Sequence, residues 1–369
     1  TARGANTLAE FNRQRAKIIP ALVALNADVV GLMEIENDGT DSLSAIQDLV
    51  NGLNAATSVG AYAFVSEPAP GADQIKVALI YQTARVTPQG AAINYQVTTN
   101  PDYNPLFDRP PLAQHFRTPD GQEFFVIVNH FKSKGSCPAS ASDPDADYGQ
   151  GCWNVKRVAQ ANGLLTLIAS LQVTDPDVIV IGDLNAYGAE DPINTLVSGG
   201  LLNQALHVPA ALRYSYVFDG QSGYLDQALT TASLNAHITG VTYWHINADE
   251  PSVIDYNTEF KPQDLYTATP YRASDHDPVL IGLGTPADFS GSAKVVNTTT
   301  ITGGELLTYT LIVSNSGDVT TNFYLTDTLN AALTVLSAPG LTQNGSTWSG
   351  SGSIGGQSTR AFTITVQTP

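Results

Sequence analysis

Residues 177–186 constrain the fold more than any other stretch of this sequence. Residues 178–181 are four apolar residues in a row, which is typical of a strand buried on both faces. Gly182 lets the chain turn, and Asp183 and Asn185 follow on one side of the strand end. A carboxylate and an amide at the mouth of a buried sheet can bind a metal ion or a reacting phosphate. The alternative is a plain turn that ends the strand, because Asp and Asn are common turn residues.

A second apolar segment, residues 28–36, also ends in carboxylates. Glu34 follows its apolar run directly, and Glu36 shares a face with Glu34 because side chains alternate along a strand. A single Glu at a strand end is usually solvated. Beside another buried strand that ends in Asp183, Glu34 becomes a candidate ligand.

Residues 124–128 form a further predicted strand, which leads into His130, Lys132 and Lys134. Lysine is a point-charge ligand for phosphate, and histidine titrates near neutral pH. We therefore expect a phosphate-facing site where this strand emerges. The alternative is a capped strand end with solvated lysines.

Two later segments carry the other acidic and histidine candidates. Asp226 lies within a predicted strand, residues 223–230, and it needs a partner there because an unpaired buried charge is costly. Asp275, His276 and Asp277 come just before an apolar strand. Because all these side chains lie in strands or at strand ends, the sequence predicts that they form one site.

Helices are expected between the strands. Thr7 and Glu10 have the spacing of a capping box, which predicts the start of a helix, and Pro20 should kink or interrupt that helix. Residues 153–171 should form another helix. Its predicted inner face is Val155, Val158, Leu165 and Ile168.

Composition limits the partners of this chain. Seventeen Lys and Arg stand against 34 Asp and Glu, for a net charge of −17. A chain this acidic is not a general polyanion binder, so contact with nucleic acid requires a local basic patch or a divalent cation. No apolar run reaches the roughly 20 residues of a membrane span. We also expect no signal peptide in the sequence, whose start looks processed or trimmed.

The two cysteines, Cys137 and Cys152, lie in one loop rich in Pro, Ser, Asp and Gly. We expect a disulfide between them, which implies an oxidising, extracytoplasmic setting. Two free thiols are the alternative. A metal site is not expected here, because the loop has no Cys-x-x-Cys spacing and no neighbouring His.

Five separated motifs occur together in a characteristic order. They are Gly31-Leu-Met-Glu34, Asn129-His130, Gly182-Asp-Leu-Asn185, Tyr224-Leu-Asp226 and Ser274-Asp-His276. In order and rough spacing they resemble the endonuclease/exonuclease/phosphatase superfamily, and residues 149–153, 255–259 and 271–276 are similar to its secreted bacterial nucleases in particular. The resemblance covers roughly residues 1–284. It implies an α/β fold, the DNase I-like four-layered α/β sandwich.

The resemblance also implies hydrolysis of a phosphodiester with a divalent cation. Mg²⁺ or Mn²⁺ is expected, with Ca²⁺ as an alternative. Glu34 resembles the principal metal-binding carboxylate, and Asp275 resembles a second one. Asp183 and Asn185 resemble the pair that orients the attacking water and contacts the scissile phosphate.

The same resemblance assigns the remaining site residues. Asp226 resembles the partner of His276, and His130 resembles the other catalytic histidine, whose acidic partner the sequence does not identify. The candidate contacts to substrate phosphate are Arg109, Lys132, Lys134 and Arg157. The superfamily's first strand, which supplies an Asn near the metal, is expected to be missing from this chain.

Composition changes after residue 284. Residues 285–292 read as a linker, and residues 293–369 are rich in Thr, Ser and Gly with almost no charge. Alternating residues at 307–313 and 362–366 predict half-buried strands. We expect a small all-β immunoglobulin-like sandwich. Residues 307–310, 314–318 and 325–329 resemble repeat domains of bacterial surface proteins, which implies a spacer or adhesive module.

Two classes of function follow from these patterns. The first is an extracellular, metal-dependent nuclease that acts on DNA, with RNA as an alternative substrate. A phosphatase or sphingomyelinase of the same fold is a related alternative, although no aromatic-rich apolar hairpin supports a lipid substrate. The second class is a non-catalytic cell-surface or matrix protein, attached through its C-terminal domain or through flanking segments. The cluster of carboxylates favours the enzyme, because an inactive site has no physical need for it.

Overall fold

The computed structural model describes residues 4–259 and 261–369, which divide into two compact units. The first unit consists of Thr1–Asn235 and Val241–Ile281, and the second consists of Ala236–Gly240 and Gly282–Pro369. None of the helices in the described ranges is long and apolar enough to cross a membrane.

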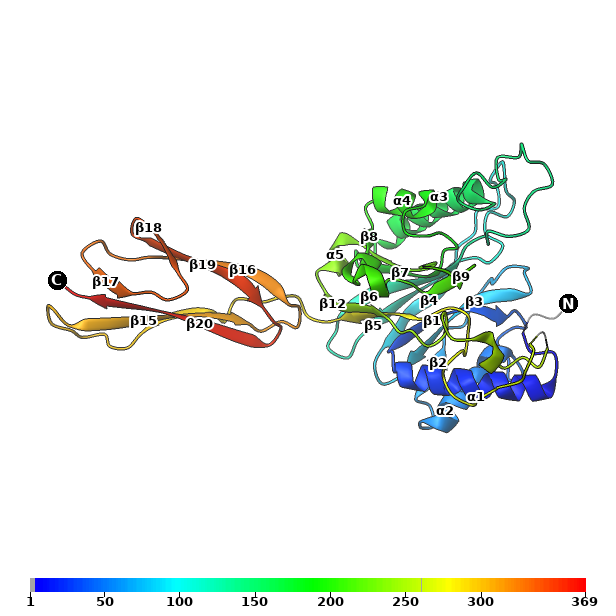
Figure 1. Ribbon diagram of the computed structural model, residues 1–369, viewed down its shortest axis with the longest axis horizontal. Coiled ribbons are helices and arrows are strands. Elements are labelled where there is room, and N and C mark those ends of the chain that lie inside the picture. The colour runs from blue at the N-terminus through cyan, green and yellow to red at the C-terminus, as the bar shows by residue number, and fades with distance from the viewer. Residues whose placement is uncertain (1–3, 260) are drawn as a thin grey trace. The chain divides into compact units, whose positions relative to one another are not determined.

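The first unit is built on two sheets (Figure 1). The antiparallel three-stranded sheet has the order β1-β3-β2, with β1 (Val29–Glu36), β2 (Tyr62–Phe64) and β3 (Ile75–Gln82). The six-stranded sheet has the order β4-β5-β6-β7-β11-β8, and only β6 and β7 in it run parallel. Its strands are β4 (Thr87–Asn94), β5 (Leu112–Arg117), β6 (Glu123–His130), β7 (Val178–Asp183), β8 (Leu202–Asn203) and β11 (Asp226–Thr230).

Two short pairs of strands accompany these sheets. They are β9 (Tyr216–Phe218) with β10 (Gln221–Gly223), and β12 (Ile238–Tyr243) with β13 (Val279–Leu283). The helices are α1 (Leu8–Leu25), α2 (Ala45–Ala56), α3 (Asn154–Leu171), α4 (Asp191–Ser198) and the short α5 (Ala232–Asn235).

The four long helices cover the outer faces of the two sheets. Ile19 of α1 and Leu53 of α2 share an apolar core with Ile80 of β3. On the opposite side, α3 and α4 share a core with β6 and β7, and Figure 1 shows the two helix pairs on opposite sides of the sheets. The sheets touch each other, since a Cβ added at Gly31 would lie only 2.6 Å from Ile181 Cδ1. The predicted four-layered α/β sandwich is therefore confirmed.

Helix α1 begins as predicted but continues past its proline. Thr7 is the N-cap, and its hydroxyl accepts a hydrogen bond from the backbone N–H of Glu10 at 3.2 Å. Pro20 lies inside α1, so the expected interruption is wrong. Ile19 and Leu22 pack into the core on either side of it, and this packing offsets the roughly 3 kcal/mol cost of an internal proline.

The predicted inner face of α3 is confirmed in part. Ile168 is buried and Leu165 packs against the same core, whereas Val155 is 45% exposed and Val158 is half-buried. The buried face instead begins with Lys156 and Arg157, whose charged groups have partners inside the protein. These polar contacts help to set which face of α3 is buried. The apolar pattern of the helix alone does not predict them.

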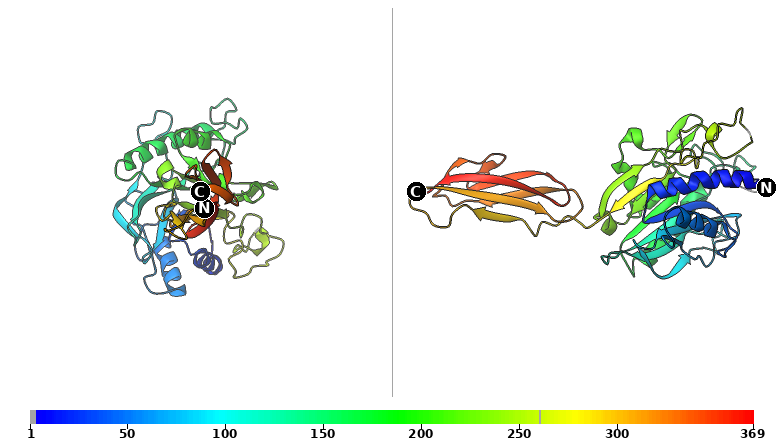
Figure 2. Two further views of the ribbon diagram at one scale, coloured as in Figure 1. Left: turned by 90° about the vertical axis from the view of Figure 1, so that its left-hand side faces the viewer. Right: turned by 90° about the horizontal axis from the view of Figure 1, so that it is seen from below.

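The second unit is all-β. Its four-stranded sheet has the order β14-β15-β20-β17, and its three-stranded sheet has the order β16-β19-β18. The strands are β14 (Ala293–Val296), β15 (Leu306–Asn315), β16 (Thr321–Thr328), β17 (Thr334–Ser337), β18 (Thr342–Asn344), β19 (Thr347–Ile354) and β20 (Ser358–Gln367), which run alongside one another in Figure 2. Phe323 of one sheet packs on Phe362 of the other, with ring centres 6.1 Å apart, so the sheets share one core. The immunoglobulin-like topology stays a prediction.

Candidate active site

The neighbouring strands β6, β7 and β11 bring three polar side chains into one row. Asp183 at the end of β7 lies opposite His130 on one side and opposite Asp226 on the other. All three residues are buried, and His130 Nε2 lies 3.6 Å from Asp183 Oδ2. The structure thus joins three of the predicted catalytic residues across adjacent strands.

The turn after β7 depends on residues with unusual backbone angles. Gly182 has a φ of 123°, and a Cβ there would lie 2.1 Å from the backbone oxygen of Asn129, so a side chain does not fit. Asn185 has a φ of 47°, which Asn tolerates better than most residues. Its backbone N–H donates to Asp183 Oδ1 at 2.7 Å, and its amide donates to Asp183 Oδ2 at 3.0 Å and to the backbone oxygen of Phe131 at 3.1 Å. Asn185 therefore fixes the carboxylate of Asp183.

His276 completes the row through Asp226. Its Nδ1 lies 2.7 Å from Asp226 Oδ2, and the ring of Tyr216 packs against the imidazole at 4.5 Å between ring centres. The side chain of His276 is 24% exposed, whereas that of Asp226 is 6% exposed. Nε2 of His276 is thus the ring nitrogen left for a water molecule or a substrate.

The pKa values of Asp183 and His276 both lie above their ordinary values. Burial raises the pKa of Asp183, and the negative charge of Asp226 raises it further, to about 7. Burial lowers the pKa of His276, but the carboxylates of Asp226, Asp183 and Asp275 outweigh this and raise it to about 10. At neutral pH the site therefore contains a protonated imidazole beside a carboxyl group that can still accept a proton.

Two residues to which the sequence analysis assigned no role hold the loop of His276. Asp277 is buried, and its Oδ1 accepts hydrogen bonds from the backbone N–H groups of residues 246, 247 and 248 at 2.8–3.1 Å. The amide of Asn247 donates to the backbone oxygen of His276 at 2.7 Å and accepts from the N–H of Ala273 at 2.8 Å. In the sequence, Asp277 stands out only as a neighbour of His276. No sequence pattern predicts a role for Asn247.

The two predicted metal ligands, Glu34 and Asp275, are both exposed. Glu34 lies at a bulge of β1 between Leu32 and Ile35 and has a φ of 60°, an uncommon backbone conformation for Glu. Burial raises the pKa of Tyr256, and nearby carboxylates that include Asp275 and Glu34 raise it further. Both carboxylates therefore lie within electrostatic reach of one tyrosine.

A cavity of about 650 Å³ opens beside His130, and Glu34, Arg109 and Lys132 are among its lining residues. Arg109 Nε and Nη2 donate to the backbone oxygens of residues 130 and 131 at 3.3 and 2.8 Å, and its Nη1 lies 3.1 Å from Asp73 Oδ2. Asp73 also lines the cavity and was not predicted from the sequence. Arg109 and Lys132 are therefore the two predicted phosphate contacts that line the cavity, and Arg109 is buried with protein partners for its guanidinium group.

The other two predicted phosphate contacts are not among the residues that line this cavity, and they too have protein partners. Lys134 Nζ donates to the backbone oxygen of Gln150 at 2.6 Å and to the carboxylate of Glu190 at 2.6 and 2.7 Å. Arg157 is fully buried, and its Nη atoms donate to the backbone oxygens of residues 132, 150 and 152. Through these hydrogen bonds Arg157 supports the disulfide loop. Because its guanidinium group has no access to solvent, it cannot reach a phosphate in this structure.

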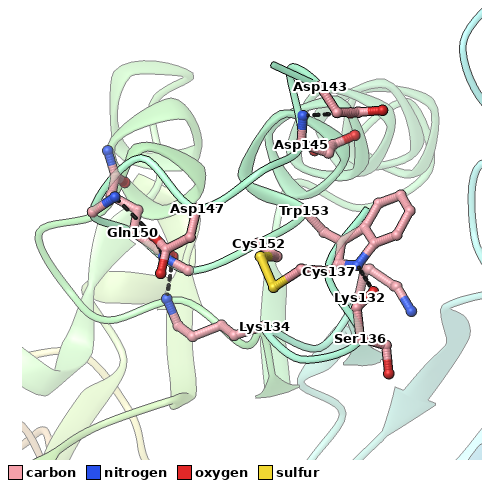
Figure 3. The surroundings of a disulfide bond; sticks show 12 residues. Lys132, Lys134, Ser136, Cys137, Asp143, Asp145, Asp147, Gln150, Cys152 and Trp153 are labelled. Carbon is pink, nitrogen blue, oxygen red and sulfur yellow. Dashed lines mark hydrogen bonds between the residues drawn. A yellow bond between two sulfur atoms is a disulfide. The ribbon is translucent and has the colours of Figure 1, made fainter. Parts of the chain in front are cut away.

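The disulfide between Cys137 and Cys152 is confirmed, with an S–S distance of 2.02 Å (Figure 3). It closes the loop beside Lys132, whose ammonium group lies 5.1 Å from the ring centre of Trp153. The indole N–H of Trp153 donates to the backbone oxygen of Ser136 at 3.0 Å. The loop therefore fixes one wall of the cavity.

The sequence profile of the Endonuclease/Exonuclease/phosphatase family matches residues 2–276, well over half of the 369 residues. The chain belongs to the endonuclease/exonuclease/phosphatase family. This is a family of hydrolases, and the DNase I-like α/β fold predicted for the first unit is confirmed. A search of curated protein sequences found no match.

Several solved structures are similar to this chain at low sequence identity. An endonuclease/exonuclease/phosphatase family protein from Bacteroides thetaiotaomicron is 18% identical with a TM-score of 0.53, and the match covers 76% of this chain and 91% of that one. A mannosyl-6-phosphatase of Bacteroides thetaiotaomicron VPI-5482 is 18% identical with a TM-score of 0.48, covering 76% and 96%. The human Nocturnin catalytic domain with bound sulfate is 19% identical with a TM-score of 0.46, covering 75% and 89%.

Members of the endonuclease/exonuclease/phosphatase family typically depend on a divalent metal. Glu34 and Asp275 fit such an ion by type, because carboxylate oxygens are the ligands that Mg²⁺ prefers. Within residues 4–259 and 261–369, these two do not belong to a group of three His, Cys, Asp or Glu side chains with ligand atoms within 4.8 Å of one another. If they hold one ion together, the two carboxylates would supply part of its coordination shell, and water and substrate oxygens would supply the rest.

Proposed function

We propose that this family member is an extracellular, divalent-metal-dependent nuclease that hydrolyses phosphodiester bonds of DNA. The observation that carries the proposal is the row of His130, Asp183 and Asp226, completed by His276. It places a proton acceptor and a proton donor side by side at the mouth of the sheet.

The residues of this row can divide the proton transfers of hydrolysis. A water oxygen forms the new bond to phosphorus while the bond from phosphorus to the leaving oxygen breaks. Asp183, with its pKa near 7, accepts the proton of the water, and Asn185 holds the carboxylate in place. His276, kept protonated by Asp226, donates a proton to the leaving oxygen or stabilises charge on the phosphoryl oxygens.

Glu34 and Asp275 would hold Mg²⁺ or Mn²⁺, with Ca²⁺ as an alternative. The chemistry that such an ion supplies when bound is neutralisation of charge on the phosphoryl oxygens. It would also offset the repulsion between a chain of net charge −17 and a polyanion. Arg109 and Lys132, which line the cavity beside His130, are the cations best placed to meet further phosphates of the substrate.

The disulfide supports a location outside the cytoplasm, because such bonds persist in oxidising compartments. We assign to the second unit a role as a spacer or an adhesive module at a cell surface or in a matrix. Its sequence is almost uncharged and rich in Thr and Ser, and it contains no pattern of residues typical of a catalytic site.

The proposal is tested by a substrate panel with Mg²⁺ or Mn²⁺. The panel compares single- and double-stranded DNA, RNA, and an oligonucleotide with a terminal phosphate. We expect cleavage within the DNA strand by the wild type and none by Asp183→Ala. Release of inorganic phosphate alone, lost in Asp183→Ala, would make the protein a phosphatase. Hydrolysis of nothing in the panel would leave the non-catalytic surface protein as the better account.

A further inference from the structure

A second group of metal-ligating side chains lies at the other end of the six-stranded sheet. It consists of His115 in β5, Glu123 at the start of β6 and Asp175 in the turn between α3 and β7. His115 is paired with Phe125, which lies five residues before His130 along β6. The group is therefore roughly 17 Å from the active-site end of that strand.

Both carboxylates of this group point at the same imidazole nitrogen. His115 Nε2 lies 3.1 Å from Asp175 Oδ2 and 3.5 Å from Glu123 Oε2. One ligand atom from each residue lies within 4.8 Å of the other two. Ligands about 2.0–2.1 Å from a tetrahedral Zn²⁺ ion lie roughly 3.3 Å apart, and the two nitrogen–oxygen distances bracket that value.

A hydrogen bond of His115 Nε2 accounts for only one of these two contacts, the one with Asp175. An imidazole nitrogen carries at most one hydrogen, whether the ring is neutral or protonated. His115 Nε2 therefore cannot donate a full hydrogen bond to Asp175 and to Glu123 at once. A divalent cation in the place of that hydrogen would bind all three side chains.

The surroundings hold two of the ligands in position. The ring of His115 stacks on Phe125, with centres 4.3 Å apart and planes 16° apart. The backbone N–H of residue 177 donates to Asp175 Oδ1 at 2.9 Å, which leaves Oδ2 directed at the imidazole. Pre-positioned ligands of this kind lower the ordering cost of binding an ion.

The third ligand keeps one side of the group open. Arg117 Nε lies 3.6 Å from Glu123 Oε1, so the other carboxylate oxygen remains directed at His115. The side chain of Glu123 is 38% exposed, whereas those of His115 and Asp175 are each 11% exposed. Water can therefore enter from the side of Glu123 and complete a four-coordinate shell.

We propose that His115, Glu123 and Asp175 bind a Zn²⁺ ion that is separate from the active site. One imidazole and two carboxylates suit Zn²⁺ better than Mg²⁺, which prefers oxygen ligands alone. The ion ties the turn before β7 to β5 and β6, so its role is structural. This assignment does not rest on the proposed nuclease activity.

Zinc binding is measured on a full-length background that lacks the predicted active-site metal ligands, Glu34→Gln with Asp275→Asn. Equilibrium dialysis against Zn²⁺ with metal analysis gives the stoichiometry and affinity. We expect one Zn²⁺ per chain, and a higher melting temperature when it is bound. His115→Gln and Glu123→Gln should each weaken binding roughly tenfold or more.

Asp120→Asn is the matched control, because this exposed carboxylate is three residues from Glu123 in the sequence and does not belong to the group. It should bind Zn²⁺ like the background chain. The proposal is overturned if the background chain binds no Zn²⁺, or if Glu123→Gln binds Zn²⁺ as tightly as the background chain does. If His115→Gln fails to fold by circular dichroism, Glu123→Gln decides, because its half-exposed side chain can change with little effect on the core.

Discussion

For the single residue Asp183, folding raises the pKa far above its ordinary value, chiefly because the carboxyl group is buried. Asp226, His276, His130 and Arg109 all face it or act on its charge. Its folded pKa of about 7 lies above the unfolded value of about 4. An acid with a raised pKa contributes stability below its unfolded pKa and loses that contribution as the pH rises through its folded pKa. Without metal, Asp183 should therefore cost up to about 4 kcal/mol of stability at pH 8 that it does not cost at low pH.

Replacing Asp183 by Asn tests this cost. Urea unfolding in EDTA should show that Asp183→Asn raises the free energy of unfolding at pH 8 and changes it little at pH 4. Asp219→Asn, at an exposed carboxylate, is the control and should change neither value. Equal destabilisation by Asp183→Asn at both pH values would mean that lost hydrogen bonds, not the buried charge, dominate at this position.

His276 is the second residue whose role can be isolated. His276→Ala removes the proton donor, and general acid–base groups contribute about 10²–10⁴-fold to rates, so DNA cleavage should fall by that factor. Stability should fall as well, because His276→Ala leaves the buried carboxylate of Asp226 without its partner. The control is His207→Ala, at an exposed histidine that belongs to neither site. A cleavage rate for His276→Ala equal to that of His207→Ala would remove His276 from the mechanism.

At the scale of elements, the loop before β13 depends on Asp277. Asp277→Ala would leave three buried N–H groups without an acceptor, which costs roughly 3 kcal/mol or more. Asp277→Asn keeps one acceptor oxygen and should cost less. Thermal unfolding gives the stability, and cleavage should fall in both variants in proportion to the displacement of His276. A melting temperature for Asp277→Ala equal to the wild type would contradict this account of the loop.

Several strands of the first unit, such as β1, β6 and β7, could be predicted from the sequence because each contains a continuous apolar run. The apolar run at residues 178–181 gave β7, and the polar residues after it gave Asp183 and Asn185. Asn247 and Asp73 could not be found in this way. Their contacts, with the loop of Ala273 and with Arg109, join segments far apart in the sequence, so no local pattern encodes them.

The inner face of α3 shows the same limit for a helix. Hydrophobic periodicity predicts which residues prefer to be buried. It takes no account of the stabilisation that Arg157 gains from hydrogen bonds to three backbone oxygens. Those bonds exist only once the disulfide loop has folded beside the helix. Arg157, which the sequence analysis predicted as a contact to substrate phosphate, therefore supports the wall of the cavity.

At the scale of the whole molecule, each of the two units has a core of its own. A fragment of residues 1–285 keeps both β12 and β13, and it should fold and cleave DNA at the rate of the full chain. Calorimetry of the fragment should lack an unfolding transition that the full chain shows. A fragment that is folded but inactive would show that the second unit contributes to catalysis, contrary to its assignment as a spacer or adhesive module.

Nuclease activity is best measured as the cleavage of plasmid DNA by this chain in Mg²⁺ or Mn²⁺, with EDTA and Asp183→Ala as controls. We expect the wild type to nick and linearise supercoiled plasmid, and we expect EDTA and Asp183→Ala each to abolish this cleavage. Cleavage that persists in Asp183→Ala, or a plasmid left intact by the folded wild-type protein in both metals, would contradict this expectation.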